Sequence, residues 1–413
     1  MKLLIVDPNL SRTSPSMKGI VAALPALKAQ GWEIEVWCWH ADEGVAVDRM
    51  VKLPRVGKMH TLDSYAFSLW ARLRAWWKFG VQKEARPDIV YSVAWYLPTC
   101  DVCHVHFSPF DWENRQRAMG MRSLRDIFER VTNLGSLWLA RRFLRNTTAH
   151  RVLCVSEAVA ADVKKENPRL NVQVLPNSYD AKRFHPALRG LHREALRTHL
   201  GISVQDHVFV FVSAGHYRRK GFFLAVDAVA RLRAKGGQGA KARLLVLGGS
   251  DARLHALKQQ LGARHRNWTS FVTFTGMVPD VEKYLSSADG FLFPSYSEAF
   301  ALVEVEAAAC GLPLFLTPHH GSEMILEDGI NGRLLEFDAD RIADVLEEYV
   351  IGNWQPERGI HLKHALDGAA YAQRFAAELK HALPETSATS KTGGAPTGAA
   401  FAKSTPETVS LTP

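Results

Sequence analysis

Short apolar runs alternate with amphipathic stretches along most of the chain. The runs with the character of buried strands are 1–6, 32–39, 88–92, 207–214, 243–248 and 290–294. The stretches with a helical period between them include 20–30, 157–165 and 222–235. Strands that alternate with helices predict an α/β protein built on doubly wound parallel sheets, whose ligands bind beyond the carboxyl ends of the strands.

The chain is too long for one typical core, because it has 413 residues. The segment 182–197 is polar and basic, so we place a boundary there. We predict one domain over 1–185, a second over 186–365, and a helix over 366–384 that packs back on the N-terminal domain. From 385 to 413 Ser, Thr, Gly, Pro and Ala dominate, which predicts a disordered tail.

The formal net charge of +9 favours an anionic partner. The segment 67–78 carries three tryptophans among basic residues, and arginines recur over 115–145 in a helical-looking region. Two interpretations stay open. These stretches are either helices that lie on an anionic bilayer or core helices whose arginines face solvent. No docking motif accompanies the charge, so we expect no nucleic-acid partner.

No apolar run is long enough for a transmembrane helix, and the opening MKLLIVDPN is too short for a signal peptide. We therefore expect a cytoplasmic protein, either free or peripheral at the inner face of the cytoplasmic membrane. The five cysteines lie among apolar neighbours, which predicts buried thiols. Cys100, Cys103 and His104 spell a haem-attachment pattern, but such a site needs an exported protein.

The stretch 291–311, FLFPSYSEAFALVEVEAAACG, runs from an apolar strand through a polar loop into a helix. Glu298 lies in the loop, and Glu306 lies inside a helix that should begin at Leu302 and end at Gly311. The first backbone amides of such a helix can bind phosphate. The alternative is an ordinary crossover in which Glu298 only complements the helix dipole.

A second loop, 215–221 (GHYRRKG), also joins a strand to a helix. Arg218, Arg219 and Lys220 could together hold a diphosphate. The glycine spacing is not that of a Walker A loop, and the first loop of the chain, 9–18, lacks the dinucleotide-binding fingerprint. Combined with the carboxylates of 291–311 at the same sheet edge, the basic loop predicts a nucleotide-diphosphate site.

His104 and His106 alternate with Val105 in an apolar segment, 101–107, that we expect to be a strand. Both rings would then point to one face of it. They are either satisfied core groups or functional contacts.

The chain resembles the retaining glycosyltransferases of the family 4 type. Glu298 and Glu306 match the E-x(7)-E motif of that family, and several weaker signals follow in the family's order. They are Val155-Ser156-Glu157-Ala158, Leu175-Pro176-Asn177 with Asp180 and Phe184, Arg219-Lys220-Gly221, Leu247-Gly248, Phe274-Thr275-Gly276, Ala288-Asp289 and Gly329-Ile330-Asn331-Gly332. The resemblance covers about residues 150 to 340 and implies the GT-B fold, two Rossmann-like domains that face a cleft.

The resemblance also implies roles for residues of the donor site. Glu298 would hold hydroxyls of the donor sugar, Glu306 the ribose hydroxyls, and Arg219 and Lys220 the diphosphate, in place of a metal ion. The other donor-binding residues would be Gly215, Arg218, Phe300, Ala301 and Leu302. A histidine of the N-terminal, acceptor-side domain would lie over the sugar, with His106 as the first candidate and His104 as the second. No cofactor is implied beyond the nucleotide sugar.

The chain departs from the family pattern at several positions. Ala299 and Ala301 stand where glycines are usual and should crowd the loop if it needs a positive φ. His216 replaces a common arginine, and Ser178 replaces the glycine of P-N-G.

These observations predict a hexosyltransferase that uses a nucleotide-diphosphate sugar, with uridine the preferred base. Its acceptor would be a cell-envelope glycan or a lipid-linked acceptor such as lipopolysaccharide core. Two alternatives are an epimerase of nucleotide sugars with the same fold and a catalytically silent module at the membrane surface.

Overall fold

The computed structural model describes residues 1–55, 60–119, 124–357, 362 and 364–384. Met1–Ala382 form one compact unit. The tail that the sequence predicts from residue 385 onward lies outside the described residues.

The first sheet consists, over the described residues, of seven parallel strands in the order β5-β3-β1-β6-β7-β8-β9. These are β1 (Lys2–Val6), β3 (Glu33–Cys38), β5 (Arg49–Lys52), β6 (Ile89–Val93), β7 (Val102–Val105), β8 (Arg151–Cys154) and β9 (Val172–Val174). A separate short pair is formed by β2 (Asn9–Leu10) and β4 (His40–Ala41). The strand order reverses at β1, which has β3 on one side and β6 on the other.

The second sheet has, in the described part of the chain, six parallel strands in the order β12-β11-β10-β13-β14-β15. These are β10 (His207–Val212), β11 (Ala242–Leu247), β12 (Val272–Gly276), β13 (Gly290–Phe293), β14 (Leu314–Leu316) and β15 (Gly332–Leu334). The order reverses between β10 and β13, and the loops that follow these two strands therefore meet at the position where doubly wound sheets bind ligands. The predicted fold class, two doubly wound α/β sheets, is confirmed.

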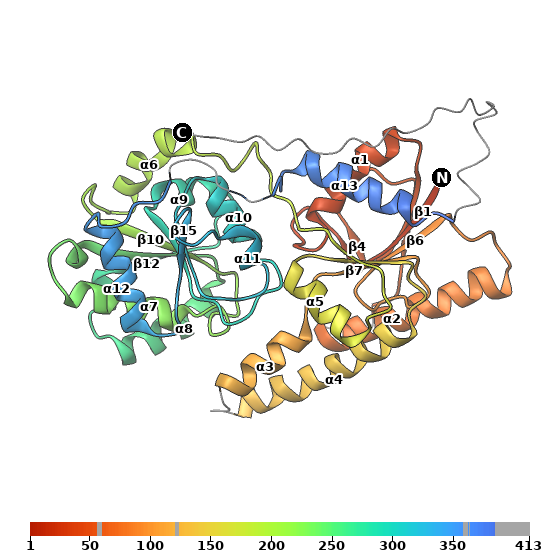
Figure 1. Cartoon of the computed structure of the whole chain (residues 1–413), viewed down its shortest axis with the longest axis horizontal. Helices are drawn as coiled ribbons and strands as arrows, with labels where there is room; N and C mark the ends of the chain where they lie inside the picture. Colours follow the sequence, from red (N-terminus) through yellow and green to blue (C-terminus); the bar gives the residue numbers. More distant parts are fainter. Residues whose placement is uncertain (56–59, 120–123, 358–361, 363, 385–413) are drawn as a thin grey trace, which may run out of the picture. The chain divides into compact units, whose positions relative to one another are not determined.

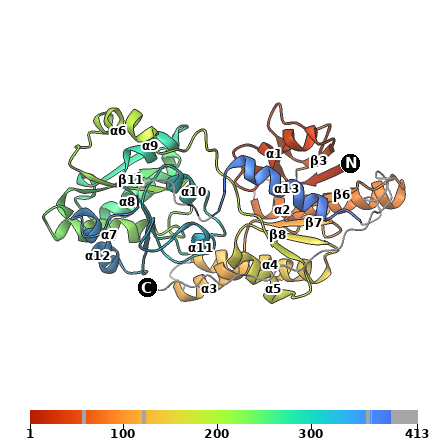
Figure 2. The same ribbon diagram turned by 45° about the horizontal axis from the view of Figure 1, so that its top comes forward.

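Helices connect the strands of both sheets (Figure 1). They are α1 (Lys18–Ala29), α2 (His60–Ala75), α3 (Pro109–Met119), α4 (Leu124–Asn146), α5 (Glu157–Glu166), α6 (Leu188–His199), α7 (Phe222–Ala234), α8 (Asp251–Arg264), α9 (Val281–Ser287), α10 (Leu302–Ala309), α11 (Ser322–Ile325), α12 (Ala339–Val350) and α13 (Gly368–His381). Figures 1 and 2 both show α13 beside α1, against which it packs. The C-terminal helix thus lies against the first helix of the chain.

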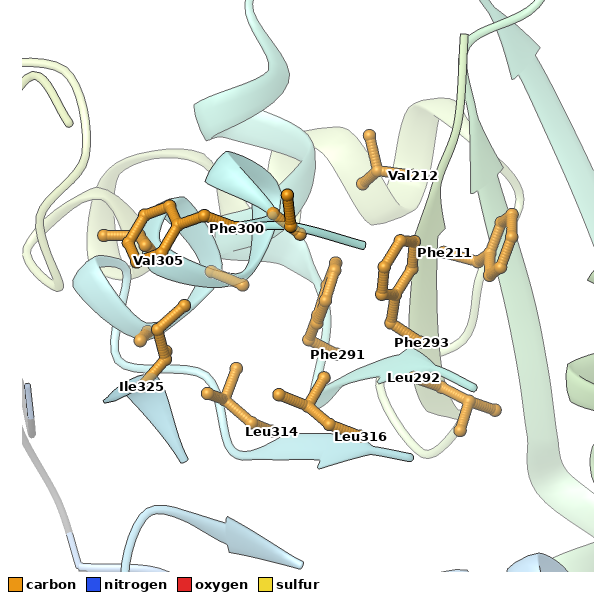
Figure 3. Packing of buried hydrophobic residues seen from close by; sticks show 14 of the residues in the cluster. Phe211, Val212, Phe291, Leu292, Phe293, Phe300, Val305, Leu314, Leu316 and Ile325 are labelled. Atoms are coloured by element: carbon orange, nitrogen blue, oxygen red, sulfur yellow. The ribbon is translucent and has the colours of Figure 1, made fainter. Parts of the chain in front are cut away.

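The second sheet is buried on both faces, as parallel sheets covered by helices are. The last five residues of β10, VFVFV, are all buried. Figure 3 shows Phe211 of β10 beside Phe293 of β13, and their ring centroids are 5.7 Å apart. Val305 of α10 and Ile325 of α11 are fully buried in the same core. This packing fixes the strand ends from which the candidate site is built.

Two helices have well-defined ends, and the one at Gly311 confirms the prediction. Ser156 caps α5, because its side chain accepts a hydrogen bond from the amide of Val159. Gly311 follows α10 with a φ of 77°, the left-handed conformation that a glycine adopts without strain after a helix. The five cysteines are buried and free, as predicted. In contrast, the strand expected over 101–107 ends at Val105, and His106 lies in the loop that follows.

Helix α6, within a segment that we expect only to be polar and basic, is anchored by buried charge. Arg189, Arg193 and Arg197 place guanidinium nitrogens 3.1, 2.6 and 2.5 Å from the carboxylate of Asp289. Burial would raise the pKa of Asp289, but Arg197 and Arg193 outweigh it and the pKa is lowered. Arg197 is only 2% exposed, so an arginine occupies a buried position where an apolar residue is usual. For this reason the sequence of the segment suggests a solvent-exposed stretch although part of it is buried.

Candidate functional site

Two loops meet where the order of the second sheet reverses, one after β10 and one after β13. Tyr296 donates its amide proton to the carbonyl of Arg219 at 2.8 Å, and the Arg219 guanidinium donates to the carbonyl of Ser297 at 3.0 Å. Gly221, with a φ of 75°, lets α7 begin next to the end of β13, because a Cβ there would lie 1.9 Å from the carbonyl oxygen of Pro294. The two loops are therefore one locked unit.

Glu298 lies in this unit among cations. Its Oε1 is 3.6 Å from Lys220 Nζ and 4.0 Å from Arg219 Nη2, and it accepts a hydrogen bond from Ser295 Oγ at 3.2 Å. Burial raises the pKa of Glu298, but Lys220 and Arg219 together outweigh it, so the pKa is lowered. The carboxylate is ionised at neutral pH and holds the two cations at the end of the sheet.

Glu306 lies on α10, and its Oε1 accepts a hydrogen bond from Lys18 Nζ at 2.9 Å. Burial raises its pKa, and Lys18 opposes that shift. Lys18 begins α1, so the contact joins segments 288 residues apart in sequence. The two glutamates of the E-x(7)-E motif thus pair with different lysines, Glu298 with Lys220 and Glu306 with Lys18.

The start of α10 presents free amides. In the described part of the chain no acceptor pairs with the backbone N–H groups of Phe300, Ala301 or Leu302. The expected crowding by Ala299 and Ala301 does not occur, because neither residue has a positive φ; Ala301 has φ −83°. The loop adopts its path without the glycines that are usual in the family.

The basic loop also contains Gly215, His216 and Arg218. Gly215 is buried, and a Cβ there would lie 2.6 Å from a guanidinium nitrogen of Arg253. Arg218 is exposed, as is His216, which has a φ of 55°. The loop thus presents its first arginine to solvent and its second, Arg219, to the carboxylate.

The two candidate histidines lie together at the end of β7, with ring centroids 4.0 Å apart. His104 is fully buried, and its Nδ1 is 2.7 Å from the hydroxyl of Tyr91. His106 is half-buried, yet both ring nitrogens are inaccessible and have no hydrogen-bond partner among the described residues. Burial lowers the pKa of His106 to about 3, so its ring is neutral. The two histidines thus contact each other, and His104 also contacts Tyr91. Neither ring has a described contact with Glu298.

Sequence reasoning missed several polar residues around these loops. Ser297 Oγ donates to Asp111 Oδ2 of α3 at 2.6 Å, and Arg115 of α3 donates to the carbonyl of Pro318 at 2.8 Å. His319, after β14, contacts Glu304 of α10. The described residues contain no cluster of three metal-ligating side chains.

Comparison with known families identifies both halves of the chain. Residues 20–183 match the model for Glycosyltransferase Family 4, and residues 206–350 match the model for Glycosyl transferases group 1. A D-inositol 3-phosphate glycosyltransferase of Xylanimonas cellulosilytica is 30% identical over 249 residues, which are 54% of this chain and 55% of that protein. The chain therefore spans just over half the length of this curated relative.

Solved structures share the fold over nearly the whole chain. WaaG, a glycosyltransferase involved in lipopolysaccharide biosynthesis, superposes with a TM-score of 0.65 at 20% identity and covers 95% of this chain and 100% of its own. Anabaena Alr3699/HepE in complex with UDP and glucose has a TM-score of 0.64 at 18% identity and covers 92% and 100%. The chain belongs to the glycosyltransferases of the family 4 type and has the GT-B fold.

Proposed function

We propose that this chain is a retaining hexosyltransferase that takes its sugar from a nucleotide diphosphate, preferably UDP. The observation that carries the proposal is the locked pair of loops, in which Arg219 and Lys220 lie within 4.0 Å of the half-buried Glu298. Doubly wound sheets bind ligands at this edge. Two cations and the free amides of α10 suit a diphosphate, and carboxylates suit vicinal hydroxyls.

Each residue of the site has a role in this proposal. Arg219 and Lys220 neutralise the diphosphate, which is also the leaving group, so that no metal ion is required. Glu298 accepts hydrogen bonds from the donor sugar. Glu306 accepts them from the ribose, which then shares or replaces the contact with Lys18. His106, whose ring nitrogens lack partners among the described residues, lies over the sugar once the donor is bound.

We assign the acceptor side to residues 1–185 and the donor side to residues 186–365. The acceptor is a cell-envelope glycan or a lipid-linked acceptor such as lipopolysaccharide core. Two solved relatives support these choices, because WaaG is involved in lipopolysaccharide biosynthesis and Alr3699/HepE was solved in complex with UDP and glucose.

The proposed activity is tested with purified protein and a panel of nucleotide sugars, with and without a chelator. We expect one preferred donor, bound and slowly hydrolysed, with UDP competing and the chelator without effect. Isomerisation of the donor without transfer would favour the epimerase alternative. No binding to any donor would contradict the proposal and favour the silent module.

The exposed aromatic surface of the N-terminal half supports a peripheral contact with an anionic membrane. Trp76 and Trp77, which directly follow α2, are 64% and 52% exposed. A pocket of about 660 Å³ between α2 and α4 is lined by Trp138, Arg72 and Arg142, among others. Arg117, Arg122 and Arg125 of the predicted basic stretch have side chains outside the described set. In the described residues no helix is long and apolar enough to cross a membrane.

Cosedimentation with phosphatidylglycerol vesicles tests this membrane contact. We expect the native chain to bind these vesicles and not phosphatidylcholine vesicles, because both apolar burial and lipid charge contribute. The variant Trp76→Ser/Trp77→Ser should bind about tenfold more weakly. Val204→Ser, which alters a residue 78% exposed in the other half, is the control and should bind as the native chain does. Equal binding by both variants would show that Trp76 and Trp77 do not contribute to membrane binding.

A further inference from the structure

Glu304 and His319 form a buried polar pair behind the candidate donor site. Their side chains are wholly inaccessible, and His319 Nε2 lies 2.6 Å from Glu304 Oε1. Glu304 belongs to the first turn of α10, and His319 lies in the loop after β14, the strand next to β13. The roles proposed above do not use either residue.

Stability alone does not explain this pair. A buried ionic pair loses about as much in desolvation as it gains in attraction, and apolar residues of similar volume often replace such a pair without loss. Glu304 Oε2 is also buried and has no hydrogen-bond partner among the described residues. A half-satisfied carboxylate in a core is costly and calls for a functional reason.

The pair is joined to the site through Phe293. The His319 ring packs edge-on against the Phe293 ring, with centroids 6.2 Å apart, and Lys220 Nζ lies 4.9 Å from the centroid of the same ring. The backbone of His319 is fixed, because Ser322 Oγ donates to its carbonyl at 2.6 Å. The imidazole of His319 and the ammonium of Lys220 therefore contact the same aromatic ring, that of Phe293. In the proposed function this ammonium binds the diphosphate.

The charges around the pair favour a protonated His319. Burial lowers the pKa of His319, but the carboxylates of Glu304 and Glu298 outweigh it and raise the pKa. Burial raises the pKa of Glu304, a shift that His319 and Lys220 oppose. Glu298 and Lys220 are thus the charged groups of the neighbouring loops that act on the pair. The cation at His319 in turn favours the ionised form of Glu298.

We propose that Glu304 and His319 are positioning residues: the imidazole of His319, oriented by Glu304, holds the Phe293 ring on which Lys220 lies, and so keeps Lys220 in place beside Glu298 for the diphosphate. This inference rests on the proposed donor site. It adds to that site two residues that do not contact the donor, Glu304 of α10 and His319 of the loop after β14.

The double variant Glu304→Leu/His319→Leu separates positioning from stability. Apolar side chains should fill the space, so we expect the variant to fold and to melt within a few degrees of the native chain. Its kcat/KM for the preferred donor should fall about tenfold, and the acid limb of its pH profile, where Glu298 becomes protonated, should move to higher pH. Glu304→Gln keeps a hydrogen-bond acceptor for His319 but carries no charge. Its kcat/KM and its acid limb should lie between those of the native chain and those of the double variant.

A titration of the Glu298 carboxyl by NMR, without any substrate, tests the pair independently of the enzyme activity. The pKa of Glu298 should be higher in the double variant than in the native chain, because Lys220 is then no longer held beside its carboxylate, whereas the charges of Glu304 and His319 are lost together. An unchanged Glu298 titration, or a native kcat/KM and acid limb in the stable double variant, would overturn the inference. If instead no donor binds to the native chain while the titration shifts, the proposed function fails and the electrostatic link stands.

Discussion

Glu298→Gln should lower kcat/KM for transfer by a hundred- to a thousandfold, on the order of the loss seen when one buried electrostatic contact to a reacting group is removed. The amide has the shape of the carboxylate but neither its charge nor its second acceptor oxygen. Binding of UDP alone should stay the same or tighten, because Glu298 contacts the sugar in our proposal and Lys220, 3.6 Å away, loses its neutralising partner. Steady-state kinetics with the preferred donor and calorimetry with UDP measure the two effects.

Glu336→Gln is the control for this prediction, because Glu336 is an exposed glutamate of the same half. It should keep native kinetics. If Glu298→Gln retained transfer within about threefold of the native rate while melting normally, Glu298 would have no role in catalysis. Loss of UDP binding in Glu298→Gln would instead place this residue on the nucleotide.

Lys220→Met should lower kcat by about a hundredfold and also weaken the binding of UDP. The methionine keeps an apolar stem over Phe293 but removes the charge that would meet the leaving diphosphate. Glu298 then keeps only Arg219, at 4.0 Å, as a cation within ion-pair distance among the described residues. The pKa of Glu298 should rise as a result, and the acid limb of kcat/KM should move to higher pH.

Lys235→Met provides a matched control just beyond the other end of α7. Lys235 pairs with Asp344 and Glu347 on the surface, where ion pairs contribute little. Its loss should leave kcat and UDP binding unchanged. Equal effects of the two substitutions, or a Lys220→Met variant that binds UDP as tightly as the native chain, would remove Lys220 from the diphosphate site.

The strand pattern and the glutamate spacing suffice to predict much of this site. β10 and β13 are apolar runs that end in polar loops, and parallel strands place such loops at one edge. Glu298, Arg219 and Lys220 therefore meet for a reason visible in the sequence. The strand order, which puts β10 next to β13 and makes this edge a crevice, is a property of the folded sheet.

The partners of the glutamates could not be predicted, because they depend on contacts between distant segments. Lys18 reaches Glu306 across 288 residues of sequence, and nothing in the first loop identifies it as that partner. Glu304 and His319 also look ordinary in sequence. A glutamate at the start of a helix is usually exposed, and only the packing of α10 on the loop after β14 buries it.

Prediction of burial from residue polarity fails where charged side chains are buried in ion pairs. The segment that forms α6 has the composition of a linker because its arginines look solvated, whereas three of them surround Asp289. The Ala288-Asp289 signal, recognised only as a family feature, thus has a structural cause. The sequence predicts His106 within a strand, but β7 ends at Val105. Strand ends are set by neighbouring strands, which a single sequence does not reveal.

A crystal structure of the chain with its preferred nucleotide sugar would test the proposed donor site directly. We predict diphosphate oxygens within hydrogen-bond distance of Arg219 and Lys220, ribose hydroxyls at Glu306, and sugar hydroxyls at Glu298. A nucleotide sugar bound elsewhere, with none of these four side chains in contact, would show that the donor site is not where we place it.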